Sequence, residues 1–431
     1  MSAPYEFELD GCFAERIGEA GLSRDAYARA LEATRPVLAG LAERHARGEL
    51  AFLRGLASSD ELAALEATAQ GLKERFERIL VIATGGSSLG GRTLATLAEG
   101  SRLAPSVRFL ENVDPESLSA ALASIEAART GFLVISKSGR TVETVSQTLV
   151  VIDRIGAELG RDALSERFVM VTEPGDNPLR RLAARFGFTV LDHDPELGGR
   201  FAAFSLVGLL PALFAGLDGR ALRRAGARVA QDSLGEDPAR SAPARGAAVI
   251  WALARERGVR AHVVMPYADR LYPFVLWFRQ LWAESLGKAG GGTTPIAALG
   301  TVDQHSQLQL YLDGPADKVF SLVLPAYDGE GATIPRSLAG EVGVEYLSGR
   351  TIGDVIAAGA RATADALGNR ARPVRLFRLA RLDAESLGAL MMHFMIETVI
   401  TAGLSGVDPF DQPALEEGKR LARDYLREMK R

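Results

Sequence analysis

Short apolar segments that alternate with helical patterns place the strongest constraint on how this chain folds. From residue 78 onward, five such segments follow one another, and helical patterns separate most of them. Strands that are apolar on both faces and are joined by helices form parallel sheets with both faces covered. The pattern therefore predicts an α/β fold. The five predicted strands cover residues 78–83, 107–110, 132–136, 168–172 and 189–191.

A second set of the same kind begins after the polar, proline-containing stretch 232–243. It predicts a second α/β unit. The strands of this set are predicted at residues 260–265, 319–324 and 374–379. Its helices are predicted at residues 272–286, 351–367 and 384–402.

The remaining parts of the chain are predicted to be helical. Helical patterns cover the first 75 residues, and a last helix is expected over about 413–429. A chain of 431 residues has room for two large domains. The predicted division is an N-terminal helical segment (1–75), a first α/β domain (76–231), a second α/β domain (232–405) and a C-terminal loop and helix (406–431).

The composition argues against several classes of function. A net charge of −4 gives no electrostatic footprint for nucleic acid or for a membrane surface. A single cysteine excludes an intrachain disulfide and argues against a thiolate metal site. Residues 1–10 lack the basic region and apolar run of a signal peptide, and no apolar stretch reaches the ~18 residues that a membrane span needs. We therefore expect a cytoplasmic protein without nucleic-acid or membrane partners.

The loop after the first predicted strand allows three interpretations. Gly86-Ser87-Ser88-Leu89-Gly90 matches the G-x-S-x-G pattern of a serine hydrolase, with Ser88 as the nucleophile. Residues 86–93 also nearly match the P-loop, but Arg92 stands where that motif requires lysine. The third interpretation is a helix N-terminus that offers backbone N–H groups, hydroxyls and a positive dipole to an anion. A tight turn without a ligand is the remaining alternative.

The loop after the third predicted strand favours the anion site. Ser136-Lys137-Ser138-Gly139-Arg140-Thr141 presents three hydroxyls, a lysine and an arginine ahead of another predicted helix. Phosphate requires this chemistry, which combines many donors with positive charge at short range. A nucleotide enzyme also needs an aspartate for magnesium at a later strand end, and no such residue is assigned. The two loops predict a site for a small phosphorylated ligand, with a solvated turn as the alternative.

One carboxylate, Glu284, lies in register with an apolar helical stripe. Glu284 lies three positions after Leu281 of this stripe, in the last turn of the predicted helix 272–286. Partial burial and the negative end of the helix dipole both favour a carboxylate that takes up a proton near neutral pH, as a general base must. The alternative is a glutamate at the edge of the stripe, paired with Arg279 or Lys288. The stripe consists of Phe274, Trp277, Phe278, Leu281 and Trp282.

Of the five histidines, His305 has the most informative neighbours. Thr301 and Gln304 have capping-box spacing, which predicts His305 in the first turn of a helix at the loop end of the fold. A helix N-terminus disfavours imidazolium, so the ring would stay neutral and exchange protons. The alternative is a surface or packing histidine. Taken alone, this alternative is preferred for His45, His193, His262 and His393. No two histidines have the i, i+4 spacing of metal ligands.

Seven segments, taken in order, resemble the glucose-6-phosphate isomerase family in its shorter bacterial form. They cover the chain from about residue 80 to 420. Each short segment is a weak signal, whereas the twelve-residue run 277–288 and the shared order are specific. The segments are residues 85–90, 136–139, 198–201, 277–288, 303–307, 408–413 and 418–419.

The resemblance implies a fold and an activity. The fold would comprise two sugar-isomerase (SIS-type) doubly wound α/β domains, with parallel sheets flanked by helices, in a homodimer. The activity would be the interconversion of glucose 6-phosphate and fructose 6-phosphate through a cis-enediolate, with no cofactor and no metal. A serine hydrolase and a non-catalytic sugar-phosphate sensor remain as alternatives. A third, narrower alternative is an isomerase that also, or preferentially, accepts mannose 6-phosphate.

The resemblance also implies residue roles. Glu284 would move a proton between C2 and C1, and Arg200 would stabilise the enediolate. His305, supplied by the partner subunit, and Lys419 would assist ring opening, while Gln412 would contact the substrate. The substrate's phosphate would be held by Gly86, Ser87, Ser136, Lys137, Ser138 and Thr141.

Three positions depart from the family's usual pattern. Arg140 stands where threonine is usual and leaves open whether it contacts phosphate. Ala268 replaces a common serine, and no catalytic consequence is expected. Glu417 precedes the Gly418-Lys419 pair where an apolar residue is also common, so a carboxylate lies close to Lys419 in the sequence.

Overall fold

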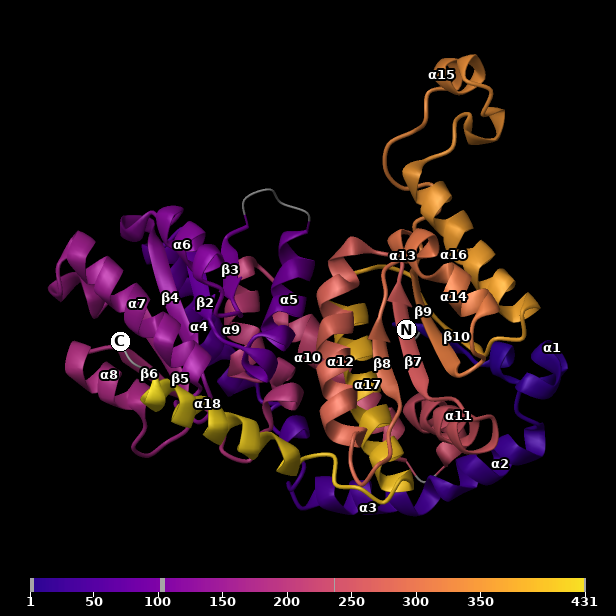
Figure 1. The fold of residues 1–431 in the computed structure, drawn as a ribbon, viewed down its shortest axis with the longest axis horizontal. Coiled ribbons are helices and arrows are strands. Elements are labelled where there is room, and N and C mark those ends of the chain that lie inside the picture. The colour runs from indigo at the N-terminus through magenta and orange to yellow at the C-terminus, as the bar shows by residue number, and fades with distance from the viewer. Residues whose placement is uncertain (1–3, 101–104, 236, 430–431) are drawn as a thin grey trace. The chain divides into compact units, whose positions relative to one another are not determined.

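Two five-stranded sheets organise the chain, one in each of two compact units (Figure 1). The computed structural model describes residues 4–100, 105–235 and 237–429. The first-sheet unit consists of residues 50–220 and 408–431, and the second-sheet unit of residues 1–49 and 221–407. The four segments expected from the sequence are thus grouped differently, because the N-terminal helical segment is shared between the units and the C-terminal segment joins the first sheet.

The first sheet is entirely parallel, with strand order β3-β2-β4-β5-β6. Each strand lies within two residues of its predicted position, which confirms the α/β prediction. The strand order reverses between β2 and β4, and in open α/β sheets ligands bind outside the carboxyl ends at such a point. The strands are β2 (Arg78–Ile82), β3 (Val107–Leu110), β4 (Thr130–Ile135), β5 (Phe168–Thr172) and β6 (Thr189–Asp192).

Helices cover both faces of the first sheet. On one face, stacked rings of Phe132 and Phe168, 4.7 Å apart, form part of a core that α6, α7 and α8 complete. Residues that point to the other face, such as Val81 and Leu133, are equally buried. The helices are α4 (Ser59–Arg75), α5 (Leu89–Glu99), α6 (Pro115–Ala123), α7 (Val142–Leu159), α8 (Pro178–Phe186), α9 (Leu206–Ala215) and α18 (Glu416–Glu428).

The second sheet has strand order β1-β10-β9-β7-β8 and is parallel except for β1. Its strands are β1 (Glu6–Glu8), β7 (Ala261–Pro266), β8 (Thr294–Ala297), β9 (Lys318–Pro325) and β10 (Val374–Leu379). The larger helices around it are α11 (Ala242–Glu256), α12 (Tyr272–Leu286), α16 (Ile352–Asn369) and α17 (Ala384–Leu404).

Two strands of the second sheet correct the sequence-based prediction. The first 75 residues were expected to be helical, but Glu6–Glu8 forms an antiparallel edge strand in which Glu6 pairs with Arg378. The second, Thr294–Ala297, lay in a stretch for which no strand was predicted. Both strands are too short to show a period, and the unpaired edge of a neighbouring strand supplies the backbone partners that fix them.

Helix α17 is the central helix of the second-sheet unit. Its 21 residues are long and apolar enough to cross a membrane, although no apolar stretch of that length was expected from the sequence. In the structure, 89% of its most apolar 18-residue window is buried inside the protein. Phe394 on α17 packs edge-to-face against Phe274 and Phe278 of α12, so this apolar helix forms part of the protein core.

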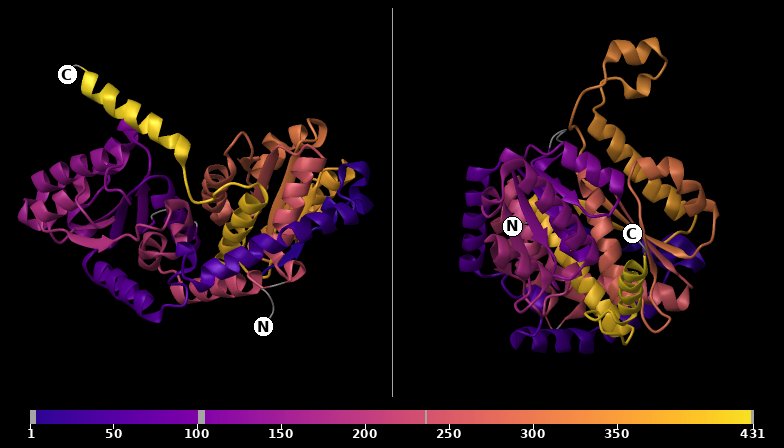
Figure 2. Two further views of the ribbon diagram at one scale, coloured as in Figure 1. Left: turned by 90° about the horizontal axis from the view of Figure 1, so that it is seen from below. Right: turned by 60° about the vertical axis from the view of Figure 1, so that its left-hand side comes forward.

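A long excursion between β9 and α16 projects away from the second sheet and carries α15, as Figure 1 and the right-hand view of Figure 2 show. Leu338, Val342 and Tyr346 of this excursion are strongly exposed. The remaining helices of this unit are α1 (Ala14–Ile17), α2 (Arg24–Ala33), α3 (Arg35–Ala46), α13 (Val302–Ser306), α14 (Leu308–Asp313) and α15 (Arg336–Glu341). Helix α10 (Gly219–Ser233) begins at the boundary between the units.

Candidate active site

The two loops expected to bind phosphate follow neighbouring strands of the first sheet. Residues 84–88 follow β2 and residues 136–141 follow β4, and Ile82 pairs with Val134 just before the two loops. Because β2 and β4 are parallel, their carboxyl ends meet at the same edge of the sheet. This is also the point at which the strand order reverses. The structure therefore brings the two donor-rich loops together.

Gly86 fixes how the first loop packs. A Cβ atom at this position would lie 2.4 Å from the carbonyl carbon of Gly199 and 2.6 Å from the backbone nitrogen of Arg200. Only glycine permits so close an approach between two backbone segments. The contact places the η7 turn (Gly199–Phe204), and with it Arg200, directly against the first of the two loops. Ser87 is half-buried beside it.

Ser88 is not placed to act as a nucleophile. Its side chain is fully buried, and its hydroxyl donates to the carbonyl oxygen of Gly85 at 3.1 Å. A serine nucleophile needs an accessible hydroxyl that a neighbouring base activates. Ser88 instead closes the turn before α5, which argues against the serine-hydrolase interpretation.

The second loop is held rigidly by the neighbouring strand. The carbonyl oxygen of Lys137 accepts hydrogen bonds from the Thr172 hydroxyl at 3.0 Å and from the Glu173 backbone at 2.9 Å. Gly139 has φ +60°, and a Cβ atom there would lie 2.0 Å from the Asn177 side-chain oxygen. Thr172 and Asn177 were not predicted to shape this loop, although Asn177 precedes a proline as a helix cap often does.

Within this loop, the hydroxyls gather at the N-terminus of α7. Ser136 is 1% exposed, and its oxygen lies 2.9 Å from that of Thr141, the residue before the helix. The Ser138 hydroxyl accepts a hydrogen bond from the Arg140 backbone at 3.3 Å. Lys137 and Ser138 are half-buried. The helix N-terminus and these donors form an environment suited to an anion.

Arg140 extends toward another loop. Its guanidinium donates to the carbonyl oxygen of Asp176 at 2.6 Å, and the residue is exposed. This contact links the two loops that follow β4 and β5.

Arg200 is buried and fixed by the C-terminal segment. It is 1% exposed, and its Nη2 donates to the carbonyl oxygens of Pro409 and of Asp411, the latter at 3.0 Å. The ring of Phe410 packs 5.2 Å from that of Phe201. These contacts hold residues 409–411 against the η7 turn, so the half-buried Gln412 follows directly after the segment that binds Arg200.

Lys419 lies on the exposed helix α18. Its ammonium donates to the Glu416 carboxylate at 2.7 Å. This hydrogen bond holds the pKa of Glu416 below its usual value. The sequence analysis singled out Glu417 as the carboxylate near Lys419. In the structure, Lys419 instead contacts Glu416, which lies one helical turn before it.

Glu284 lies at the edge of the apolar stripe of α12. All five stripe residues are at most 1% exposed, while Glu284 is half-buried. Its carboxylate accepts a hydrogen bond from the Gln280 amide at 2.9 Å. Trp282 donates through its indole N–H to the Thr293 hydroxyl at 2.9 Å. The last turn of α12 is thus anchored next to the start of β8.

His305 is exposed on α13, a helix of five residues. The predicted capping box is wrong, because the Thr301 side chain makes no capping hydrogen bond. The side chain that holds the start of α13 is that of Asp303. Its carboxylate accepts from the Leu299 backbone at 2.7 Å and from the Gln307 amide at 3.0 Å. An acidic residue in the first turn of a helix was the available signal.

Glu284 and His305 lie at opposite ends of strand β8. Glu284 is close to the start of β8 through the bond between Trp282 and Thr293, and His305 follows the end of β8. A four-residue strand alone spans roughly 13 Å. The second-sheet unit of one chain therefore presents the two residues at separate places.

Comparisons with known proteins identify the family. A family model described as phosphoglucose isomerase matches residues 63–311. The chain is 42% identical to glucose-6-phosphate isomerase of Rubrobacter xylanophilus over 347 residues, which covers 79% of this chain and 80% of that protein. It is 34% identical to the enzyme of Carboxydothermus hydrogenoformans over 424 residues, which covers 94% and 90% of the two chains.

Solved structures agree on the fold. A hypothetical protein from Thermus thermophilus superposes with a TM-score of 0.84 at 33% identity, covering 98% of this chain and 100% of that one. A glucose-6-phosphate isomerase from Chlamydia trachomatis superposes with a TM-score of 0.74 at 22% identity, covering 86% and 73%. With a family model that spans more than half of its residues and relatives above 30% identity over most of its length, the chain belongs to the phosphoglucose isomerase family.

Proposed function

We propose that this protein is an aldose–ketose isomerase that interconverts glucose 6-phosphate and fructose 6-phosphate through a cis-enediolate. The observation that carries the proposal is the meeting of two donor-rich loops and Arg200 at the switch point of the first sheet, in a chain of this family. The reaction would serve glycolysis and gluconeogenesis in the cytoplasm.

The phosphate group binds at the two loops in this proposal. Gly86 and Ser87 contribute from the first loop, and Ser136, Lys137, Ser138 and Thr141 contribute from the second. Two observations support this assignment of phosphate-binding residues. The backbone around Lys137 is held by hydrogen bonds, and hydroxyls gather at the N-terminus of α7. Binding energy at this remote end of the sugar orients the reacting carbons, which can lower the barrier without taking part in chemistry.

Proton transfer is assigned to Glu284. Aldose and ketose differ in the positions of two protons, one bound to carbon and one bound to oxygen. A single base that abstracts the carbon-bound proton from C2 and returns it to C1 moves the first, and the second passes from O2 to O1 at the enediolate. Arg200 supplies fixed positive charge for the enediolate oxygen, because its guanidinium is already held by backbone carbonyls and needs no reorganisation. Gln412, which follows that carbonyl segment, contacts the sugar.

Ring opening is assigned to His305 and Lys419, with His305 supplied by a partner subunit. The support for a homodimer is the position of Glu284 and His305 at opposite ends of β8, since one chain presents them apart. Two apolar side chains close to His305 in the sequence are also exposed, Val302 to 61% and Leu310 to 52%. A second copy of the chain would bury them at an interface that includes His305.

A coupled assay that follows fructose 6-phosphate to glucose 6-phosphate tests the proposed function. We expect full activity in the presence of a chelator, because every proposed step uses side chains of this chain. Mannose 6-phosphate serves as the comparison substrate for the narrower isomerase alternative. A simple carboxylic ester serves as the comparison substrate for the serine-hydrolase alternative. Absence of sugar-phosphate turnover, or a rate that the chelator abolishes, would contradict the proposal.

Substitutions in the second loop are expected to weaken substrate binding. Lys137→Ala removes a charge-assisted contact, so we expect KM for the sugar phosphate to rise about 10- to 100-fold. Ser136→Ala should raise KM by about 2- to 10-fold, with kcat less affected in both variants. Arg140→Ala is the matched control, because its guanidinium binds the Asp176 carbonyl. Equal KM values in the three variants and the wild type would exclude this loop as the phosphate site.

A further inference from the structure

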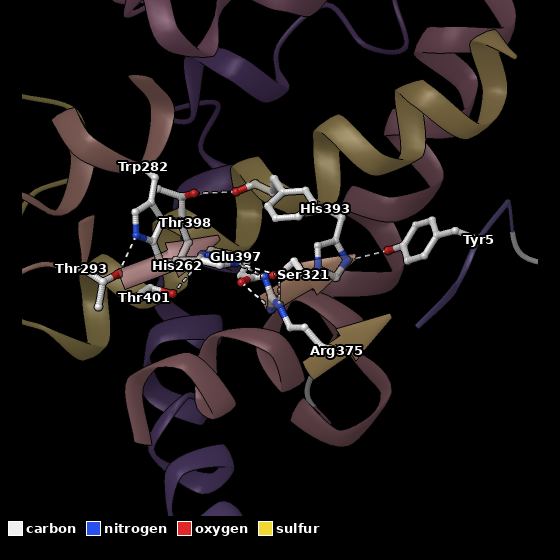
Figure 3. Close-up of polar contacts among 11 residues, drawn as sticks. Tyr5, His262, Trp282, Thr293, Ser321, Arg375, His393, Glu397, Thr398 and Thr401 are labelled. Atoms are coloured by element: carbon white, nitrogen blue, oxygen red, sulfur yellow. Dashed lines mark hydrogen bonds and ion pairs between the residues drawn. The ribbon is translucent and has the colours of Figure 1, made fainter. Parts of the chain in front are cut away.

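A chain of buried polar side chains runs through the core of the second-sheet unit (Figure 3). We call it the core network. Tyr5 is 8% exposed, and each of the other five members is 0% exposed. Its members come from residues beside or within β1, β7, β9, β10 and α17. They are Tyr5, His262, Ser321, Arg375, His393 and Glu397.

One branch of the core network leads to the N-terminal strand. Arg375 Nη1 and Glu397 Oε1 lie 2.8 Å apart, and Glu397 Oε2 lies 2.8 Å from His393 Nε2. Because a carboxylate only accepts, His393 carries its proton on Nε2 and accepts from the Tyr5 hydroxyl, 2.7 Å from Nδ1. Burial lowers the pKa of His393 despite the opposing charge of Glu397, so the imidazole is neutral.

The other branch leads to His262. Arg375 Nε donates to the Ser321 hydroxyl oxygen at 2.6 Å, and that oxygen lies 2.7 Å from His262 Nε2. A guanidinium only donates, so the Ser321 hydrogen points to His262 Nε2, which must accept. Arg375 Nη2 also donates to this nitrogen, at 3.3 Å. Burial and the charge of Arg375 hold the pKa of His262 well below its usual value. His262 is therefore neutral, with its proton on Nδ1.

His262 in turn supports α12. Its ring lies 4.9 Å from that of Trp282 and 5.0 Å from that of Phe278, at interplanar angles of 78° and 76°. His262 Nδ1 has no hydrogen-bond partner among the described residues, and an edge-to-face arrangement allows an N–H group to donate to a ring face. Trp282 also binds Thr293. The last turn of α12, which carries Glu284, thus rests on His262 and on Thr293.

A contribution to stability alone does not explain the buried ion pair between Arg375 and Glu397. Replacing a buried ion pair by apolar side chains of similar volume is often neutral or stabilising. Here the surrounding residues are largely aromatic, and Gly246 is required beside the pair, since a Cβ atom there would lie 2.7 Å from Glu397 Oε2 and 2.8 Å from Arg375 Nη1. Arg375 does make directional bonds, to the Ser321 hydroxyl and to His262 Nε2, and these bonds fix the tautomer and the orientation of His262.

We infer that Arg375 and Ser321 are positioning residues for Glu284, acting through the ring of His262 on the last turn of α12. The inference rests on the proposed function, in which Glu284 is the base. In this arrangement Arg375 orients Ser321, and both residues donate to His262 Nε2 and so hold its ring in a single tautomer. The ring of His262 in turn packs against Trp282 on α12. A general base must be held to a fraction of an ångström, because a misplacement of about 1 Å can cost about 10²-fold in rate.

A pair of single-hydroxyl deletions tests the inference. Ser321→Ala removes the shorter of the two bonds to His262 Nε2 and leaves the 3.3 Å contact with Arg375 Nη2, whereas Tyr5→Phe cuts the other branch of the same network. Both remove one buried hydroxyl, so we expect similar falls in Tm, of about 2–6 °C. Only Ser321→Ala should lower kcat, by about 10-fold with KM unchanged. Incorporated 5-fluorotryptophan should show a shifted ¹⁹F signal for Trp282 in Ser321→Ala and an unshifted one in Tyr5→Phe.

The outcomes separate this inference from the proposed function. Unchanged kcat in Ser321→Ala, or equal losses of kcat in the two variants, would overturn the positioning role. If one of these two results is found and Glu284→Gln is inactive, the positioning role fails and the proposed function stands. If Glu284→Gln keeps wild-type activity, the assignment of Glu284 as base fails first, and the inference fails with it.

Discussion

Replacing Glu284 by glutamine is expected to abolish turnover while substrate binding is retained. Glutamine keeps the size of the side chain and can still bond to Gln280, so the last turn of α12 should be undisturbed. It cannot accept a proton from carbon, and a positioned base typically contributes about 10²- to 10⁴-fold. We expect kcat in the coupled assay to fall by at least that factor, with little change in the Kd measured by calorimetry.

An isotope experiment sharpens this prediction. Loss of deuterium from C2 of labelled glucose 6-phosphate reports proton abstraction directly, so it should stop together with turnover. Gln280→Ala is the control, because it removes the neighbour of Glu284 and leaves the carboxylate in place. A Glu284→Gln variant that keeps more than a few per cent of wild-type kcat would show that another group is the base.

Mixing two inactive variants is expected to restore activity if His305 acts across a dimer interface. Glu284→Gln and His305→Ala each damage both sites of a homodimer. In a mixed dimer, however, one site receives both damaged residues and the other receives neither. Random reassociation makes half of all dimers mixed, so about one quarter of wild-type activity should return. The coupled assay, run before and after a dissociation and reassociation step, measures this recovery.

The design has a matched control in the same two positions. A Glu284→Gln, His305→Ala double variant mixed with Glu284→Gln cannot form an intact site, so it should stay inactive. Native mass spectrometry establishes that mixed dimers have formed in both experiments. Mixed dimers without recovered activity would place His305 and Glu284 in the same subunit's site or remove His305 from the mechanism.

Much of the fold could be predicted from the sequence because parallel strands are buried on both faces. The predicted and observed bounds coincide for residues 107–110, 168–172 and 374–379, which are mainly apolar. The strand Glu6–Glu8 could not be found in this way. Its partner Arg378 comes from the far end of the chain, and three residues carry no detectable period.

The candidate site was predictable where the chemistry is local. The two loops proposed to bind phosphate were selected from hydroxyl and basic residues within a few positions of each other, and the structure brings these loops together. The environment of Arg200 was not, because its carbonyl partner Pro409 lies 209 residues away in the chain. His262 and His393 were expected to be surface or packing histidines. Both are buried, and their bonds to Ser321 and Glu397 depend on the tertiary structure.

The pairing of β1 with β10 has a consequence for synthesis on the ribosome. Glu8 and Arg378, which bond to each other in the finished sheet, are 370 residues apart. At about 5 to 20 residues per second, Glu8 waits about 20 to 70 s for its partner. All five strands of the first sheet emerge during that wait. Glu6 and Glu8 flank Phe7 with negative charge, which discourages this unpaired strand from joining neighbouring nascent chains.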